Sequence, residues 1–294
     1  MQNPLPLVTI ICTSYNHEKY VEDCLDSVAK QEYSNIQLIL VDDCSTDTSF
    51  QKMVNWLKQN ALPNLKYWRN QRNLGLNKSF NQALLQADGD YIMDLAADDI
   101  LFPKAIQHLV KAFQNSTYQH CGIVFGNAQF IKEDHTWIKN YLPKNQVPPT
   151  GKITEAMQGA DFELCTVSAL YKKEVYQILN GYDESLMYED LDFWIRATRL
   201  FEVDYTPEFI VKRIVHKKSL ESYFYHPFHF KAFQINWCTL KILKKAFFEN
   251  QSNQLWNRAL FKRVMHEQSK FKWNWILWLY YQQLIYRIQK SLIS

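Results

Sequence analysis

The chain has 294 residues, of which 47% are hydrophobic and 21% are charged. This composition is that of a folded globular protein and excludes a disordered chain. The net charge of +3 is unevenly distributed: residues 231–294 hold 11 Lys/Arg and 2 Asp/Glu, whereas residues 1–230 hold 22 and 28. We therefore expect an acidic body and a basic tail that contact different partners.

The cysteines predict no disulfide framework. None forms a CxxC pair, and they are spread over positions 12, 24, 44, 121, 165 and 238. We interpret them as reduced residues in or near the core, which suits a cytosolic protein. The N-terminal segment lacks a basic region and a small-residue cleavage site, so we expect a first β-strand there and no signal peptide. The sequence thus predicts a cytoplasmic location.

The first hundred residues alternate between strand-like and helix-like hydrophobic periods. We expect strands at residues 7–13, 36–41, 65–68 and 91–95. Helices are expected between them, at residues 18–31, 48–60 and 78–87, and after Pro103, since proline suits a first helical turn. This alternation is typical of a parallel sheet with right-handed crossovers.

Residues 120–230 break this alternation. They predict a strand at 122–130, a proline-bearing loop at 139–151, and helices at 173–179 and 191–200. From residue 230 onward the pattern is helical to the end.

Polar segments follow each of the four predicted parallel strands. They are SYN at 14–16, DDCS at 42–45, NQRNLG at 70–75 and AADD at 96–99. Because ligands bind outside the carboxyl ends of the strands in open parallel sheets, we expect these segments to meet at one edge. Carboxylates gathered there would repel one another unless a cation offsets their charge. Since Mg²⁺ and Mn²⁺ take one or two carboxylates plus phosphate oxygens, the pattern predicts a nucleotide-diphosphate site.

Each acidic pair also has a structural interpretation. Asp42 and Asp43 could cap the helix that follows them, and Asp98 and Asp99 could cap the helix near Pro103. Two such pairs at equivalent ends of successive strands favour the ligand site over capping alone.

Four motifs, in this order and spacing, carry a resemblance to a known family. VTIICTSYN, ILVDDCSTD, NLGLNKSFNQAL and GDYIMDLAADD resemble the inverting glycosyltransferases of family 2, and the likeness continues to GYDE at 181–184 and to Glu189-Asp190. The resemblance implies the GT-A fold: an α/β protein with a mixed, mostly parallel central sheet flanked by helices, here with a helical C-terminal extension. It also implies a metal-dependent enzyme of the hexosyltransferase type, which moves a sugar from a nucleotide-diphosphate sugar, above all a UDP-sugar, to an acceptor hydroxyl.

The resemblance assigns nucleotide-sugar contacts to matching positions. Ser14 lies in the turn that contacts the nucleotide, and Asp43 occupies the position that holds the base, usually uracil. Asn73 and Lys78 fall in the motif after the third strand, where Lys78 could approach a phosphate or remain a surface lysine.

Asp98 and Asp99 match the DxD region, in which one carboxylate meets the ribose and another meets Mn²⁺ or Mg²⁺. The resemblance leaves open which of the two ligates the metal directly. This chain departs from the frequent D-A-D-D pattern because Ala96 replaces the first carboxylate. Asp94 would need a register change to replace it. His216 matches a histidine that some family members place near the metal or the diphosphate, with a structural histidine as the alternative.

Asp190 matches the catalytic base of the family, with Glu189 beside it. A hydroxyl that attacks an anomeric carbon must lose a proton, and a carboxylate within hydrogen-bond reach can accept it. A cation offsets the charge that grows on the departing diphosphate, so a single displacement inverts the anomeric configuration. The alternative is that Glu189, Asp190 and Asp192 are first-turn acids that complement a helix dipole.

The basic tail, residues 231–294, is rich in tryptophan. Between Lys272 and Arg287 lie 14 residues without a charge, fewer than the roughly 20 that span a bilayer. Tryptophan and tyrosine beside lysine and arginine suit the headgroup region, so we expect an amphipathic helix on an anionic inner leaflet. Packing against the catalytic domain, or a dimer contact, is the alternative. The HxxH spacing of His226 and His229 lacks further zinc ligands.

We therefore divide the chain into a GT-A domain at 1–230 and the basic tail at 231–294. The domain comprises a nucleotide-binding half, 1–103, and an acceptor-binding half, 104–230. A tail on the membrane favours a lipid-linked glycan acceptor in bacterial surface polysaccharide or lipopolysaccharide biosynthesis, with a soluble sugar or a protein as the alternative acceptor.

Two other functions remain open. A nucleotidyltransferase that forms nucleotide sugars needs a glycine-rich loop after the first strand, which SYNHEKY lacks. A non-catalytic GT-A-like binding protein would fit the loss of the first DxD carboxylate. The basic residues of the tail are interleaved with aliphatics and form no nucleic-acid motif, so we expect no nucleic-acid partner.

Overall fold

The computed structural model describes residues 5–60, 62–160, 162, 164–216, 223–224, 229–250, 253–270 and 274–293. The chain forms two compact units. The sheet unit comprises Met1–Gly151, Cys165–Glu184 and Phe201–Val215, and the helical unit comprises Lys152–Leu164, Ser185–Leu200 and His216–Ser294. Segments on both sides of residue 230 thus belong to the helical unit, and the division into functional domains at that residue stays a prediction.

The first half of the sheet is parallel. Its order is β3-β2-β1-β4, and its strands are β1 (Val8–Ser14), β2 (Ile36–Asp42), β3 (Leu65–Arg69) and β4 (Tyr91–Ala96). Strand β1 is buried along its whole length, as expected of a strand covered on both faces. The predicted parallel strands are confirmed to within a residue at each end.

The second half of the sheet is mixed. Strand β8 is antiparallel to both β4 and β6, β6 is parallel to β9, and β5 and β7 pair antiparallel with β9 and β6. Their bounds are β5 (Asp99–Leu101), β6 (Cys121–Lys132), β7 (Trp137–Asn140), β8 (Ala169–Lys172) and β9 (Glu202–Val215). This mixed α/β architecture confirms the predicted fold class.

Strand β9 was not predicted from the sequence, and Pro207 explains why. Proline within a strand removes a ladder hydrogen bond and normally argues against a strand. Here Gly126 of β6 pairs with Thr206 while the next residue, Asn127, pairs with Phe209. Pro207 therefore lies in a bulge, where its missing N–H costs no ladder bond.

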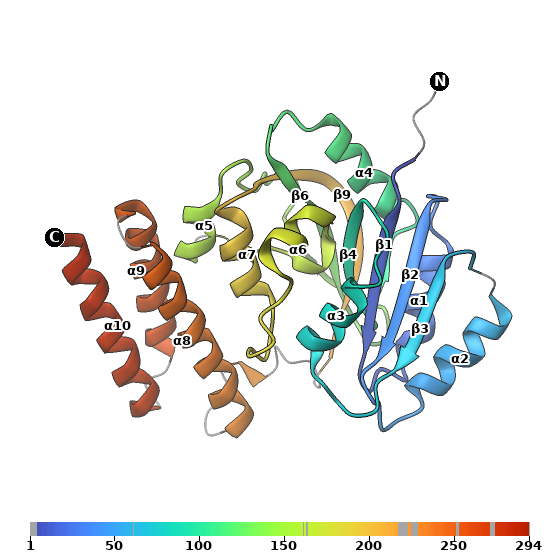
Figure 1. Ribbon diagram of the computed structural model, residues 1–294, viewed down its shortest axis with the longest axis horizontal. Coiled ribbons are helices and arrows are strands. Elements are labelled where there is room, and N and C mark those ends of the chain that lie inside the picture. Colours follow the sequence, from blue (N-terminus) through green and yellow to red (C-terminus); the bar gives the residue numbers. More distant parts are fainter. Residues whose placement is uncertain are drawn as a thin grey trace. The chain divides into compact units, whose positions relative to one another are not determined.

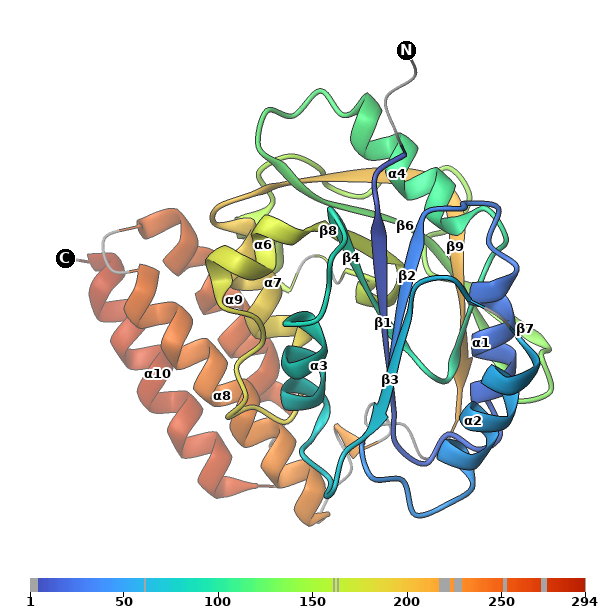
Figure 2. The same cartoon turned by 45° about the vertical axis from the view of Figure 1, so that its right-hand side comes forward.

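Helices cover both faces of the sheet (Figure 2). One face carries α1 (Val21–Ala29), α2 (Ser49–Gln59) and α4 (Ala105–Asn115), and the other carries α3 (Leu76–Leu84) and α6 (Lys173–Leu179). Helix α3 begins two residues before its predicted start, directly after Gly75, whose φ of +84° turns the chain.

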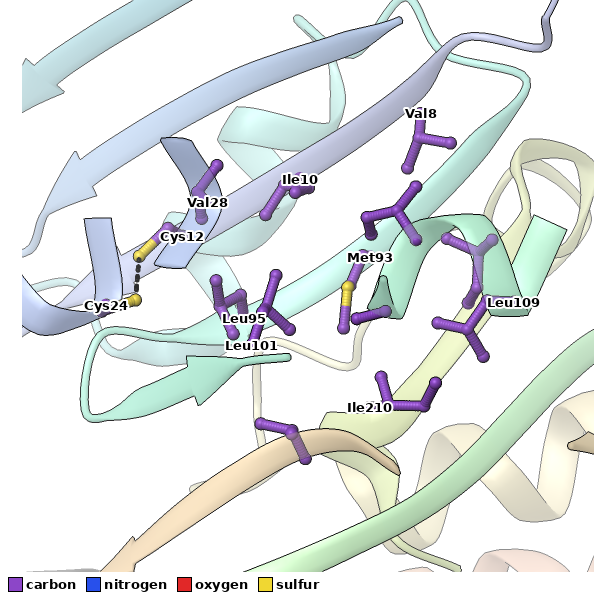
Figure 3. Close-up of a cluster of buried hydrophobic side chains, with 14 of the residues drawn as sticks. Val8, Ile10, Cys12, Cys24, Val28, Met93, Leu95, Leu101, Leu109 and Ile210 are labelled. Atoms are coloured by element: carbon purple, nitrogen blue, oxygen red, sulfur yellow. Dashed lines mark hydrogen bonds between the residues drawn. The ribbon is translucent and has the colours of Figure 1, made fainter. Parts of the chain in front are cut away.

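The first face holds a continuous apolar core. Ile10 of β1 and Met93 of β4 are fully buried in it together with Leu109 of α4 (Figure 3). The sulfur atoms of Cys12 and Cys24 lie 3.9 Å apart in the same core. All six cysteines are free and only the one at position 44 is not fully buried, which confirms that they are reduced core or near-core residues.

The helical unit contains α5 (Thr154–Gly159), α7 (Asp190–Thr198), α8 (Phe230–Asn250), α9 (Gln254–Lys270) and α10 (Trp275–Ile293). The last three lie side by side (Figure 1). Helix α10 buries one face, because Leu277, Tyr281, Leu284 and Ile288 recur at helical spacing and are at most 1% exposed. These residues pack with α7, α8 and α9 in a second apolar core. The predicted helical tail is confirmed.

Length and hydropathy also bear on the tail. None of the helices in the described part of the chain combines the length and the apolar character that crossing a bilayer requires.

Candidate functional site

The loops that follow β1, β2, β3 and β4 meet at the carboxyl edge of the sheet. The backbone N–H of Asn16 donates to Ser45 Oγ at 2.9 Å and joins the first two loops. Asn70 Nδ2 donates to Asp43 Oδ1 at 2.9 Å and joins the second and third. The fourth loop lies beside the first, because Asp98 Oδ2 is 3.9 Å from His17 Nε2. The predicted convergence of these segments on one edge is confirmed.

The carboxylate of Asp43 holds the loop after β3. Besides Asn70, its Oδ1 accepts from the N–H of Leu74 at 2.8 Å, and its Oδ2 accepts from the N–H of Gly75 at 2.8 Å. Asp43 is only 4% exposed. Since a carboxylate has about four acceptor sites, Oδ2 keeps capacity for a further donor.

The Asp42 carboxylate is held by other residues of the protein and does not face a ligand. It is fully buried, and its Oδ2 accepts from the N–H of Ser45 at 3.0 Å and from Arg69 Nε at 3.2 Å. A buried carboxylate requires such partners. The N-cap residue of α2 is Thr48, and the first N–H of the helix, that of Ser49, donates to Asp47 Oδ1 at 2.9 Å. The capping interpretation of Asp42 is therefore wrong.

The two carboxylates of the DxD region have different environments. The Asp98 side chain is 18% exposed, whereas Asp99 is 2% exposed and pairs across the sheet with Arg213 of β9. Burial, and then the charge of Asp98, raise the pKa of Asp99 well above its usual range. Neither residue caps α4, whose N-cap is Lys104. Asp98 is thus the more accessible of the two.

The predicted divalent cation has one accessible carboxylate at this edge, that of Asp98. A cation beside Asp98 would offset the repulsion between the adjacent carboxylates. Within the described ranges, no cluster of three or more His, Cys, Asp or Glu side chains could hold a metal ion. Mg²⁺ and Mn²⁺ sites of this kind need only one or two carboxylates, because phosphate oxygens complete the coordination.

The other predicted nucleotide-sugar contacts lie on the same loops. Ser14 ends β1 and is 2% exposed, and its Oγ has no hydrogen-bond partner among the described residues. Asn73 is exposed, and its Oδ1 accepts from the N–H of Gly75 at 3.2 Å. Lys78 Nζ lies 3.9 Å from Glu184 Oε2 at the surface. Their ligand contacts stay predictions.

The GYDE segment is attached to α3. Asn81 Nδ2 donates to the carbonyl of Tyr182 at 2.9 Å, and the N–H of Tyr182 donates back to Asn81 Oδ1 at 2.9 Å. Asn77 Nδ2 donates to the carbonyl of Asp183 at 2.8 Å. Gly181 has φ +69°, and a Cβ there would lie 2.4 Å from Asn81 Oδ1. Only glycine fits this turn.

Asp190 and His216 belong to the helical unit. Asp190 begins α7, and the N–H of Leu191 donates to its Oδ1 at 2.6 Å. Its neighbour Asp192 is 2% exposed and accepts from Arg196 Nε at 2.7 Å and from Lys245 Nζ at 3.0 Å. Asp192 thus anchors α7 to α8. His216 is 8% exposed. The roles of Asp190 and His216 stay predictions.

Two further side chains, which were not among the predicted site residues, lie at the sheet edge. Tyr15 is 43% exposed directly after β1. His17 Nε2 lies 3.9 Å from Asp98 Oδ2. Tyr15 could have been predicted from the sequence, because it is an aromatic residue directly after the predicted nucleotide contact Ser14. A lone histidine gave no signal for His17.

Asp94 lies within β4, opposite Ile11 in a register without a shift, so it does not replace Ala96. Tyr182 Oη donates to its Oδ2 at 2.9 Å. Burial raises the pKa of Asp94 to about 7, and the hydrogen bond from Tyr182 opposes this shift. Asp94 therefore links β4 to the GYDE segment.

The comparisons with known proteins agree with this geometry. A family model described as "Glycosyl transferase family 2" matches residues 9–179. This match spans more than half of the chain, so the chain belongs to glycosyl transferase family 2 and is a glycosyltransferase.

One relative is an uncharacterized glycosyltransferase of Methanocaldococcus jannaschii, 29% identical over 83% of this chain and 86% of its own length. The chain covers 64% and 57% of two further relatives, from Rickettsia typhi and Bacillus subtilis.

Two solved structures share the fold. S. aureus TarS 1-349 in complex with UDP-GlcNAc has a TM-score of 0.59 at 17% identity, over 90% of this chain and 83% of that one. The mannosyltransferase PcManGT from Pyrobaculum calidifontis, in complex with GDP-Man and Mn²⁺, has a TM-score of 0.59 at 17% identity, over 98% and 85%. The GT-A-type fold predicted from the sequence is confirmed.

The raised pKa of Asp94 predicts a pH-dependent stability. Between about pH 4 and pH 7 folded Asp94 keeps a proton that the unfolded chain has lost, so stability should fall as pH rises through this window. At about 1.4 kcal/mol per pKa unit, the fall is of the order of 4 kcal/mol. Asp94→Asn should flatten the dependence, measured by urea unfolding from pH 4.5 to 8.

Asp134→Asn is the control, because Asp134 is exposed and the hydrogen bonds that its carboxylate accepts from Thr136 lower its pKa. It should leave the slope in this window unchanged. If the free energy of unfolding of Asp94→Asn depended on pH as steeply as that of the unsubstituted protein, the prediction would be contradicted.

Proposed function

We propose that this chain transfers a sugar from a UDP-sugar to an acceptor hydroxyl, with inversion at the anomeric carbon and with a divalent cation. The observation that carries the proposal is the meeting of Asp43 and Asp98 with the loops after β1 and β3 at one sheet edge. Membership of glycosyl transferase family 2 sets the reaction class.

The donor site is proposed around Ser14, Tyr15 and Asp43. Tyr15 exposes a ring on which a base can stack. The free acceptor capacity of Asp43 Oδ2 suits an N–H on the edge of uracil. The unpartnered Oγ of Ser14 would gain a partner from the nucleotide. The complexes of S. aureus TarS with UDP-GlcNAc and of PcManGT with GDP-Man support a nucleotide-diphosphate sugar as the donor.

Mn²⁺ or Mg²⁺ is proposed beside Asp98, with Asp99 and His216 as further candidates. Asp98 is favoured as the direct ligand because Asp99 is buried in the sheet. The bound cation would offset the charge on the departing diphosphate. The complex of PcManGT with Mn²⁺ supports metal use in this fold.

Asp190 is proposed as the base. The acceptor oxygen bonds to the anomeric carbon, the bond from that carbon to the diphosphate oxygen breaks, and the acceptor proton passes to Asp190. One displacement on the face opposite the leaving group inverts the configuration.

Asp190→Asn should lower turnover by about 100-fold or more, because general-base catalysis contributes that much, while UDP-sugar binding stays unchanged. Turnover is measured as acceptor-dependent UDP release, and binding by calorimetry. Glu189→Gln, one residue away, is the control and should keep most of the activity. Full activity of the Asp190→Asn enzyme would refute the base assignment.

Asp98→Asn should abolish the Mn²⁺ dependence of UDP binding, because it removes the accessible carboxylate. The measurement is UDP affinity with and without Mn²⁺. Asp88→Asn serves as the control, since Asp88 is an exposed carboxylate before the start of β4. If Asp98→Asn and Asp88→Asn showed the same Mn²⁺ dependence, the cation would lie elsewhere.

The helical unit is proposed to bind an anionic membrane surface on the inner face of the plasma membrane. Helix α10 exposes large apolar side chains at Ile276, Trp278, Leu279, Tyr280, Tyr286 and Ile293. Arg287 and Lys290 are exposed on the same helix, within a tail of 11 Lys/Arg and 2 Asp/Glu. Aromatic and cationic side chains together suit the headgroup region. A lipid-linked glycan of surface polysaccharide or lipopolysaccharide assembly is then the proposed acceptor.

Replacing Arg287 and Lys290 with glutamine should weaken binding to phosphatidylserine vesicles by about 2 kcal/mol, or roughly 30-fold, since each cation contributes about 1 kcal/mol. Leu279→Glu should weaken it further. Co-sedimentation measures the binding. The control is Leu85→Glu in the sheet unit, where Leu85 is 83% exposed. Equal sedimentation of all variants would rule out α10 as the membrane contact.

A further inference from the structure

We propose that α8 and α10 together form a site for the phosphate monoester of a membrane lipid, which is bound by Lys244 of α8 and Arg287 of α10. This site rests on the proposed membrane contact of the helical unit. It adds the chemical group of the lipid that the contact recognises, and it assigns part of the contact to α8.

One stripe of α8 carries two aromatic rings and a cation. Phe233, Trp237 and Lys244 are four and seven residues apart, so they lie on the same face of the helix. The rings of Phe233 and Trp237 stack with their centroids 6.0 Å apart. All three side chains are partly buried. Their positions are therefore restricted by the surrounding helices.

Tyr280 of α10 joins this stripe to a second cation. Its ring packs edge-on against Trp237, with centroids 4.9 Å apart, and Lys244 Nζ lies 4.8 Å from the centroid of the Tyr280 ring. Arg287 follows Tyr280 by seven residues and so lies two turns further along the same face of α10. The two helices run beside one another (Figure 1). The site is thus built from both helices.

Lys244 and Arg287 are close enough to repel each other. Burial, and then the charge of Arg287, lower the pKa of Lys244 from its ordinary value. Both effects disfavour the charged lysine. The Tyr280 ring attracts the ammonium group, but a cation–π contact at a partly exposed site contributes only about 0.5–1 kcal/mol. An anion bound by both cations would remove the repulsion.

The tail supplies no carboxylate for this purpose. Its two acids are Glu249 and Glu267, which form salt bridges with Arg199 and Arg263. Among the described residues, neither cation of the site forms a salt bridge with a carboxylate. By contrast, Nζ of the next lysine along α8 lies 3.0 Å from Asp192 Oδ1. The compensating anion must therefore come from outside the chain.

The chemistry of the two cations favours a phosphate monoester. Such a group carries a charge of about −1.5 to −2 at pH 7 and has three acceptor oxygens, which match two adjacent cations. Lys244 offers three N–H donors, and the guanidinium of Arg287 can bind two phosphate oxygens at once. Trp237 and Tyr280 beside these cations suit the headgroup region of a bilayer. The ligand is therefore assigned to a lipid.

The test compares vesicles that contain phosphatidic acid, a lipid with a phosphate monoester, with phosphatidylserine vesicles of the same surface charge. The full chain should bind phosphatidic acid more tightly, as measured by co-sedimentation. Lys244→Gln should weaken this binding at least about 10-fold and remove the preference, because a hydrogen bond between charged groups contributes more than a screened surface charge. Equal affinity of the unsubstituted protein for both vesicles would overturn the proposal.

Lys241→Gln is the matched control. Lys241 is an exposed cation on α8, three residues before Lys244. Its loss should weaken binding to both kinds of vesicle by about 5-fold, the usual contribution of one cation near an anionic surface, and should keep the preference for phosphatidic acid. If Lys241→Gln and Lys244→Gln lost the same affinity for phosphatidic acid, the attraction would be diffuse and the site would be wrong.

Arg287→Gln tests whether the two cations act as one site. Alone it should also remove the preference for phosphatidic acid, and in the Lys244→Gln background it should change the preference little further, since residues that share a ligand are not additive. Fully additive losses in the double variant would show two independent charges and contradict a shared site.

Inorganic phosphate distinguishes a lipid from a soluble ligand. Calorimetry without vesicles should detect no saturable binding of phosphate to the full chain. Saturable binding that Lys244→Gln abolishes would assign the site to a soluble phosphate and overturn the lipid.

The vesicle measurements also separate this proposal from the proposed function. If the full chain bound neither kind of vesicle, the membrane contact and the phosphate site would both be refuted. If it bound both kinds equally, and Leu279→Glu weakened both, the membrane contact through α10 would hold and only the phosphate site would be refuted.

Discussion

The buried carboxylate of Asp43 is the interaction on which the sheet edge depends. Its hydrogen bonds with Asn70, Leu74 and Gly75 fix the loop after β3 to the end of β2. Without them, two backbone N–H groups would lose their partners, at a cost of about 1–3 kcal/mol each. The same loop sets the start of α3, and α3 in turn holds the GYDE segment. The carboxylate of Asp43 therefore has two effects: it provides the proposed contact to the nucleobase, and through α3 it positions the GYDE segment.

The sequence was sufficient to predict what depends on local patterns. Buried β-branched runs identified the parallel strands, and the rule that ligands bind at the carboxyl ends of such strands located the site. Strand β9 was missed because the bulge around Pro207 is visible only in its pairing with β6. The difference between Asp98 and Asp99 could not be predicted either. It arises because Asp99 is buried against β9, a strand more than 100 residues later in the chain.

Two acidic residues of α7 in the helical unit, Asp190 and Asp192, differ in burial and in their partners. Asp192 is buried between Arg196 and Lys245, whereas Asp190, two residues earlier, is only partly buried. A buried carboxylate with two cationic partners is a rigid anchor, since removing either partner leaves a charge poorly compensated. Asp192 lies in the first turn of α7, as the dipole interpretation expects, and it also joins α7 to α8 through these two cations. An anchored neighbour gives α7 a fixed N-terminus, as a proposed catalytic carboxylate requires.

The two units are interleaved along the chain, which crosses from one to the other five times, at residues 151, 164, 184, 200 and 215. The sheet is complete only when β9 has been synthesised, because β9 lies between β6 and β5. Such long-range pairings slow folding. A gene fragment ending near residue 230 would encode every strand, yet it would leave α5 and α7 without the helices of their own core. This architecture therefore resists the modular shuffling by which consecutive domains are recombined.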